Sequence, residues 1–287
     1  MRNCFIILFF LFSVNKIAGQ ELYVFTEPAS NLPAHAISLK LTDHFVTGDN
    51  IYKRFSNRIM PQVMFGISQK FMFHIGGTFA NMHTPDFKYE SVNFYAKYRF
   101  LSNDEIHKHF RMAAFVDATA TKAPFHYDEI TLKGDKSGVE AGIIATQLWN
   151  KFALSGTISH TQVIDQSRNN KVIYIPERMY QAMNYSLSGG ILLFPKEYTD
   201  YKQTNVNLYA ELLAQQTLDT KKQFIDLAPA IQFIFNSNAK LNIGYRFQVS
   251  GTMLRMATDS WLLSFERTFL NALKKKLIIN QSIHNLG

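Results

Sequence analysis

The sequence has 287 residues and a formal net charge of +8, and 47% of its residues are hydrophobic and 14% aromatic. Charged residues make up 18%, below the roughly 25% of an average soluble domain. The Lys and Arg residues are scattered along the chain instead of gathered in a basic patch, so the charge does not predict a nucleic-acid partner.

The first residues have the pattern of a secretory signal peptide. A positive start with Arg2 precedes the apolar run 5–12, and small residues follow near Gly19. This run is well short of the roughly 18 apolar residues of a membrane-spanning helix, and no later segment reaches that length. We expect residues 1–19 to be removed, and with them Cys4, the single cysteine. An exported chain without disulfides needs another source of stability, for which a closed barrel is a candidate.

Alternation of side chains predicts β-strands along most of residues 20–287. In the segment 91–101, Val92, Phe94 and Tyr98 fall on one parity, and Lys97 and Arg99 fall on the other. Similar segments recur, flanked by an N-terminal segment, 20–35, and a C-terminal tail, 271–287. The predicted strands are 37–42, 58–67, 71–81, 91–101, 110–120, 138–148, 152–161, 183–193, 205–215, 224–235, 241–249 and 260–269.

The connections between these segments indicate how the sheet closes. Those after the even-numbered strands are turns, whereas those after the odd-numbered strands are mostly longer loops. Outer-membrane barrels have this asymmetry, with short periplasmic turns and long extracellular loops. The pattern therefore predicts an all-β, antiparallel transmembrane barrel of about twelve strands. A soluble β-sandwich is the alternative. Pro61 and Pro229 lie inside predicted strands, and we expect a bulge at Pro229.

The inward parity of these strands carries most of the charge. A barrel of this size falls between small barrels filled by side chains and large open porins. The charges either line an aqueous channel or pair across the lumen and close it, and the sequence leaves both interpretations open. The candidate lumen-lining residues are Lys40, Arg58, Lys97, Arg99, Arg111, Asp117, Glu140, Glu211, Asp226, Arg246 and Glu266.

No catalytic, cofactor or metal site is predicted. Some outer-membrane barrels hydrolyse lipids with a His and a Ser on the outer wall, but His160 has no serine in a suitable context. His107 and His109 form an incomplete metal-ligand set. The acidic residues 128, 129 and 135 are an equally weak signal for calcium.

Three stretches carry a resemblance to a known family: Glu21–His35, Ala96–Phe100 and His109–Met112. In these the chain resembles a family of uncharacterised exported outer-membrane β-barrel proteins of Gram-negative bacteria, and the resemblance covers most of the exported chain. It implies an outer-membrane location and, loosely, transport, but no substrate or site residues. Partners expected for such a barrel are outer-membrane lipid, the barrel-assembly machinery, periplasmic chaperones and small solutes.

The sequence thus favours a passive channel or transport accessory for small solutes, without enzymatic activity. One alternative is a non-conducting barrel with a structural role, or with a surface-binding role through the segments Asp165–Gln181 and Thr121–Lys136. A lipid-modifying enzyme of the outer membrane is a weaker alternative.

Overall fold

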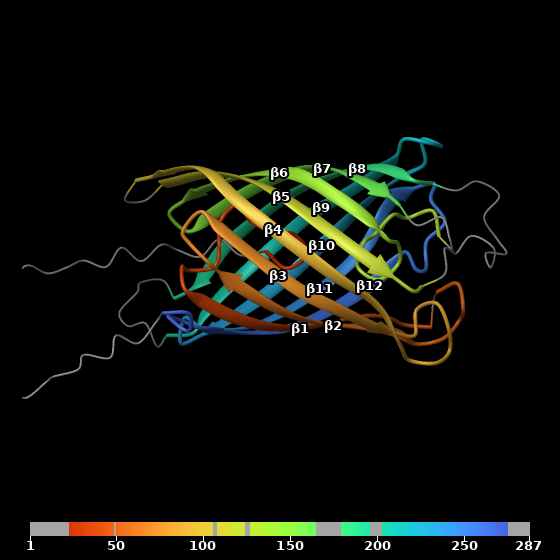
Figure 1. Ribbon diagram of the computed structural model, residues 1–287, viewed down its shortest axis with the longest axis horizontal. Helices are drawn as coiled ribbons and strands as arrows, with labels where there is room; N and C mark the ends of the chain where they lie inside the picture. The colour runs from red at the N-terminus through yellow and green to blue at the C-terminus, as the bar shows by residue number, and fades with distance from the viewer. Residues whose placement is uncertain are drawn as a thin grey trace, which may run out of the picture.

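The computed structural model describes residues 23–48, 50–105, 108–123, 127–164, 179–195 and 203–274. In this part of the chain twelve antiparallel strands form one closed barrel, and β1 pairs with both β2 and β12 (Figure 1). The strands are β1 Ala36–Val46, β2 Ser56–Gly66, β3 Phe71–Ala80, β4 Lys88–Asp104, β5 Lys108–Thr121, β6 Gly138–Trp149, β7 Phe152–Val163, β8 Gln181–Phe194, β9 Asn205–Thr217, β10 Gln223–Phe235, β11 Ala239–Gly251 and β12 Asp259–Phe269. The predicted antiparallel barrel is confirmed. None of the described residues form a helix that is long and apolar enough to cross a membrane.

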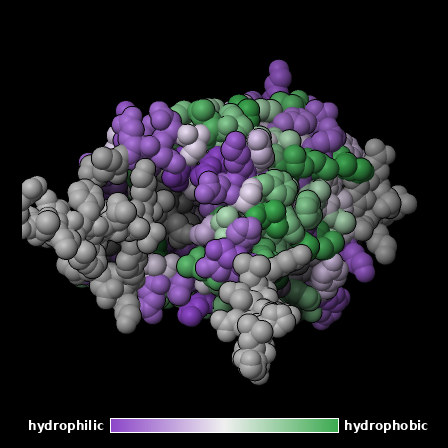
Figure 2. Space-filling view, turned by 60° about the vertical axis from the view of Figure 1, so that its left-hand side comes forward, coloured by the Kyte–Doolittle hydropathy of each residue, from purple (hydrophilic) through white to green (hydrophobic). Residues whose placement is uncertain are grey.

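The apolar side chains of the strands face outward. On β4, Val92, Phe94 and Tyr98 are 45–48% exposed, whereas the inward Lys97 is 1% exposed. Exposed Leu, Ile and Phe side chains recur on most of the strands, and part of this apolar surface is visible in Figure 2. A water-soluble sheet would bury this face, so the outer surface matches a hydrocarbon environment and the polar side chains fill the interior. Arg267 interrupts this face near the end of β12.

β1 begins and β12 ends at the same end of the barrel, on the left in Figure 1. We call it the periplasmic end, because most of its connections are short. These connections are 67–70, 105–107, 150–151, 195–204 and 236–238, and those at the opposite, extracellular end are 47–55, 81–87, 122–137, 164–180, 218–222 and 252–258. The segregation follows the prediction, except that the periplasmic connection 195–204 is longer than the extracellular connection 218–222.

Strand boundaries also differ from prediction at the β4–β5 turn, the second periplasmic turn. β4 continues to Asp104 and β5 begins at Lys108, so the polar segment 102–109, predicted as a turn, is mostly paired strand. Polar residues do not end these strands, because the backbone hydrogen bonds between β4 and β5 can continue beyond the part of the barrel that has an apolar outer face.

The two strand prolines lie where a ladder is interrupted. Pairs are missing at Met60 and Pro61 on the β2–β3 side, and at Ala228 and Pro229 on the β10–β11 side. Each proline keeps a partner on its other neighbour. The register is the same before and after both gaps, so the bulge expected at Pro229 is wrong; the β10–β11 register shifts earlier, next to Ile225. Skipping ladder positions accommodates the missing N–H groups without inserting a residue.

Candidate functional site

The segment before β1, residues 23–35, folds back into the lumen and is called here the N-terminal segment. Its backbone is not part of the sheet, so its N–H groups need other acceptors. The carboxylate of Glu211 on β9, fully buried, accepts hydrogen bonds from the amides of Val24, Phe25 and Thr26 at 2.8–3.0 Å. It also accepts one from the Thr26 hydroxyl at 2.7 Å. Glu211 therefore fixes the beginning of the segment at the β9 wall.

Lys97 on β4 holds the next part of the N-terminal segment. Its Nζ donates to the carbonyl oxygens of Pro28 and Ser30 at 2.8 and 2.9 Å, and to Glu27 Oε2 at 3.3 Å. Burial alone would raise the pKa of Glu27, but the positive charges of Lys97 and Lys40 outweigh it and hold this pKa at about 2. Glu27 is thus an anion held inside the lumen.

A second segment, the described part of the β5–β6 loop (residues 122–123 and 127–137), enters the lumen from the extracellular end. Tyr127, Asp128, Ile130 and Leu132 are each less than 5% exposed. The Gln215 side chain on β9 binds both the amide and the carbonyl group of Ile130, at 2.8 and 2.7 Å. The interpretation of Thr121–Lys136 as a surface-binding loop is therefore wrong for its described part. Residues 165–178, most of the other predicted surface-binding segment, Asp165–Gln181, lie outside the described residues.

Three acidic residues attach the β5–β6 loop to basic groups on the strands and on other extracellular connections. Asp128 binds Lys222 at 2.9 Å, and Asp135 binds Arg58 as well as His83. Burial alone would raise the pKa of Asp135, but Arg58 and His83 hold it well below its usual range. The loop is thus anchored at two separate places by buried ion pairs.

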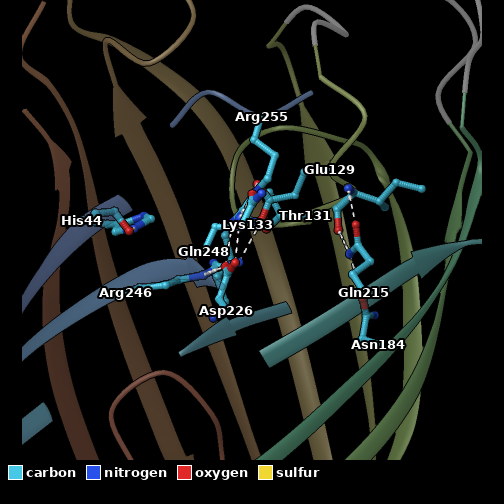
Figure 3. A network of polar contacts seen from close by, with 12 residues as sticks. His44, Glu129, Thr131, Lys133, Asn184, Gln215, Asp226, Arg246, Gln248 and Arg255 are labelled. Carbon is cyan, nitrogen blue, oxygen red and sulfur yellow. Dashed lines mark hydrogen bonds and ion pairs between the residues drawn. The ribbon is translucent and has the colours of Figure 1, made fainter. Parts of the chain in front are cut away.

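The third acidic residue, Glu129, belongs to a four-membered charge network (Figure 3). Arg255 contacts Glu129 at 2.9 Å and Asp226 at 2.8 Å, and Arg246 also contacts both carboxylates. Burial alone would raise the pKa of Glu129, but the two guanidinium groups lower it to about 2. Two cations and two anions compensate one another here, joining the loop to β10, β11 and the β11–β12 connection.

A cavity of about 360 Å³ lies between the two segments. Phe25 and Glu27 of the N-terminal segment and Thr131 and Lys133 of the β5–β6 loop contribute to its lining. Most of the rest of the lining comes from the strands, with further residues of the two segments and of the connections 81–87 and 252–258. Its lining is of mixed polarity and carries charges of both signs.

The sequence-predicted lumen residues divide into two groups. Those that line the cavity are Lys40, Arg58, Asp117, Glu140 and Arg246. Four others make polar contacts in the interior: Lys97, Arg111 and Glu211 bind the N-terminal segment, and Asp226 binds two arginines. Glu266 pairs with Lys240 at 2.9 Å, and Arg99 is half-buried on the same parity as Lys97.

Sequence reasoning missed the lumen residues that lie outside the strands. Glu27, Glu129 and Arg255 belong to connections, whose direction strand alternation does not predict. The β5–β6 loop did carry a usable signal, because it concentrates acidic residues in a chain that is basic as a whole. Such residues are natural partners for the inward-facing arginines of the strands. The N-terminal segment carries no comparable charge pattern.

Together, the closed barrel, its apolar outer face and its charged lumen define an outer-membrane β-barrel fold. The structure is similar to that of an outer membrane channel from Pseudomonas putida F1, with a TM-score of 0.56 and 12% identity, covering 85% of this chain and 100% of that chain. It is also similar to the NanC porin, with a TM-score of 0.50 and 10% identity, covering 81% of this chain and 100% of that one. No protein-family model and no curated protein matches the sequence.

Proposed function

We propose that this protein is a passive outer-membrane channel for small polar solutes, whose lumen is narrowed by the N-terminal segment and the β5–β6 loop. The observation that carries the proposal is the cavity between these segments, lined by charged side chains from both the segments and the wall. The fold similarity to a protein described as a channel and to one described as a porin supports it.

The charges that line the cavity do not favour one particular ion. Lys40 and Lys133 bring positive charge to the cavity, and Asp117 and Glu140 bring negative charge. A lumen with both signs lacks the single-sign ring that gives strong ion selectivity. We therefore expect weak selectivity between small anions and cations.

A non-conducting barrel is the main competing function, because the same two segments could close the lumen permanently. The lipid-enzyme alternative gains little: the cross-strand neighbours of His160 are Ala141 and Met183, and neither side chain is a nucleophile. We therefore retain the prediction that the protein is not an enzyme.

Two lysines on β4 provide a matched test in planar lipid bilayers. Lys97→Met removes the cation that holds residues 27–30, whereas Lys88→Met removes a lysine that is 58% exposed and pairs with Asp86. We expect a small conductance for the wild-type protein, a severalfold increase for Lys97→Met and no change for Lys88→Met. Absence of conductance in folded wild-type protein and in folded Lys97→Met would overturn the channel proposal in favour of a non-conducting barrel.

A further inference from the structure

One row of polar side chains crosses the cavity wall. His74 on β3, Tyr95 on β4, Asp117 on β5 and Glu140 on β6 are direct cross-strand neighbours, each paired in register with the next. All of them line the cavity. Four adjacent strands thus present a continuous band of hydrogen-bonding groups to the same space.

Several polar atoms of this row have no hydrogen-bond partner among the described residues. They are Tyr95 Oη, His74 Nδ1 and one carboxylate oxygen of Asp117. Tyr95 and His74 are each only 5% exposed. Burying such a group without a partner costs about 1–3 kcal/mol, so natural structures seldom leave one unmatched. The row thus lines the cavity and holds polar atoms whose hydrogen bonds are not satisfied within the described residues.

Apart from Glu211, which backbone amides hold, the buried acids of the lumen differ from the carboxylates of the row. Glu129, Asp135 and Glu266 each have a basic partner within 3.3 Å. Asp117 and Glu140 directly oppose each other across β5 and β6, and in the described part of the chain neither has an ion-pair partner.

The hydrogen-bond donors to these two carboxylates are neutral groups. Asn93 donates to Asp117, and Ser159 and Asn184 donate to Glu140. Like charges directly opposite each other on neighbouring strands are destabilising. A cation placed between them would relieve this repulsion.

Aromatic rings complete the site. Tyr95 stacks on His74 with 4.4 Å between ring centroids and on Phe115 with 5.4 Å. Phe115 also lines the cavity. An aromatic face beside carboxylates suits an ammonium group with a short alkyl chain, because the ring attracts the cation and contacts the methylene groups. A bare metal ion would not use the rings.

We infer that the row His74–Tyr95–Asp117–Glu140 is a binding site for the ammonium group of a small organic amine. The inference deepens the proposed function, on which it rests for the route by which a solute reaches the cavity. Lys133 also lines the cavity and acts electrostatically on Asp117, so a bound amine has to overcome its repulsion.

Calorimetric titration of the whole purified barrel in neutral maltoside micelles tests the site, with micelles alone as the blank. Butylamine is the probe, and butyrate and butanol have the same chain length without the positive charge. We expect saturable binding of butylamine and none of the other two. Asp117→Asn and Glu140→Gln should each weaken butylamine binding at least tenfold. Asp86→Asn, at a carboxylate 75% exposed on a loop, should leave it unchanged.

Lys133→Met is expected to strengthen binding severalfold, because it removes the competing charge. Two variants that weaken binding and one that strengthens it keep the test decisive if one of them fails to fold. Equal binding of butyrate and butylamine, or unchanged binding in folded Asp117→Asn and Glu140→Gln, would overturn the amine site. Binding is measured without a membrane. A folded protein that binds butylamine but does not conduct would therefore refute only the channel.

Discussion

The N-terminal segment and the β5–β6 loop enter the same lumen from opposite ends, but they are attached by different chemistry. The N-terminal segment is held mainly through its backbone: amides donate to Glu211 and Thr146, and carbonyl groups accept from Lys97. The β5–β6 loop is held mainly through its side chains, and its three acids bind basic groups on β2 and on two extracellular connections. Protonation of the loop's own acids therefore weakens its attachment directly, whereas in the N-terminal segment Glu27 contributes only one of several bonds.

The largest effect is expected from Arg255→Met. The guanidinium binds both Glu129 and Asp226, and it is 8% exposed. Removing one partner of a buried ion pair typically costs about 3–5 kcal/mol, because the remaining charges lose their compensation. We expect amide hydrogen exchange to accelerate across the β5–β6 loop while the N-terminal segment keeps its protection. Equal acceleration in both segments would mean that they are not independent.

Glu211→Gln should have the reverse pattern with a smaller effect. The change removes the negative charge and one of the two acceptor oxygens that bind the amides of residues 24–26. Leaving buried donors unsatisfied costs about 1–3 kcal/mol. Exchange of these amides should accelerate while that of Ile130 in the β5–β6 loop stays slow. Unchanged protection of residues 24–26 would show that Glu211 does not fix the N-terminal segment.

Acid should loosen the ion-paired attachment of the loop between about pH 4.5 and pH 2. The pKa of Glu129 is lowered from 4.5 to about 2, so its contribution to stability is present above pH 4.5 and is lost as pH falls toward 2. Glu27 titrates over the same range, but the amide bonds to Glu211 add a second attachment in the N-terminal segment. Hydrogen exchange from pH 6 to pH 3, corrected for the intrinsic rate, should show the loop losing protection first. Earlier loss of protection in the N-terminal segment would contradict the proposed difference between the two attachments.

The smallest effect is expected at alkaline pH, again in the loop. Burial lowers the pKa of Lys136 from 10.5 to about 7, so the unfolded chain binds more protons than the folded chain between these values. Stability should therefore rise as pH increases from 7 to 9. Lys136→Met should abolish this rise, measured by urea unfolding in micelles. A rise of the same size in the variant would assign it to another group.

Sequence reasoning succeeded where the signal is local. Alternation along 91–101 placed Phe94 outside and Lys97 inside, and the parity of connection lengths predicted the barrel. The two lumen segments were not predicted, because their positions depend on contacts between distant residues. Val24 and Glu211 are 187 positions apart, and Glu129 and Arg255 are 126 apart. No short-range periodicity encodes such pairs.

That the N-terminal segment narrows the conducting path can be tested with a reversible crosslink. Thr26 Oγ1 and Ser188 Oγ on β8 are 2.9 Å apart, so cysteines at these positions can form a disulfide between segment and wall. The pair is introduced together with Lys97→Met, and single-channel conductance is recorded before and after reduction. We predict low, wild-type-like conductance in the oxidised form and a severalfold increase on reduction. The same conductance in both forms would contradict the role of the N-terminal segment.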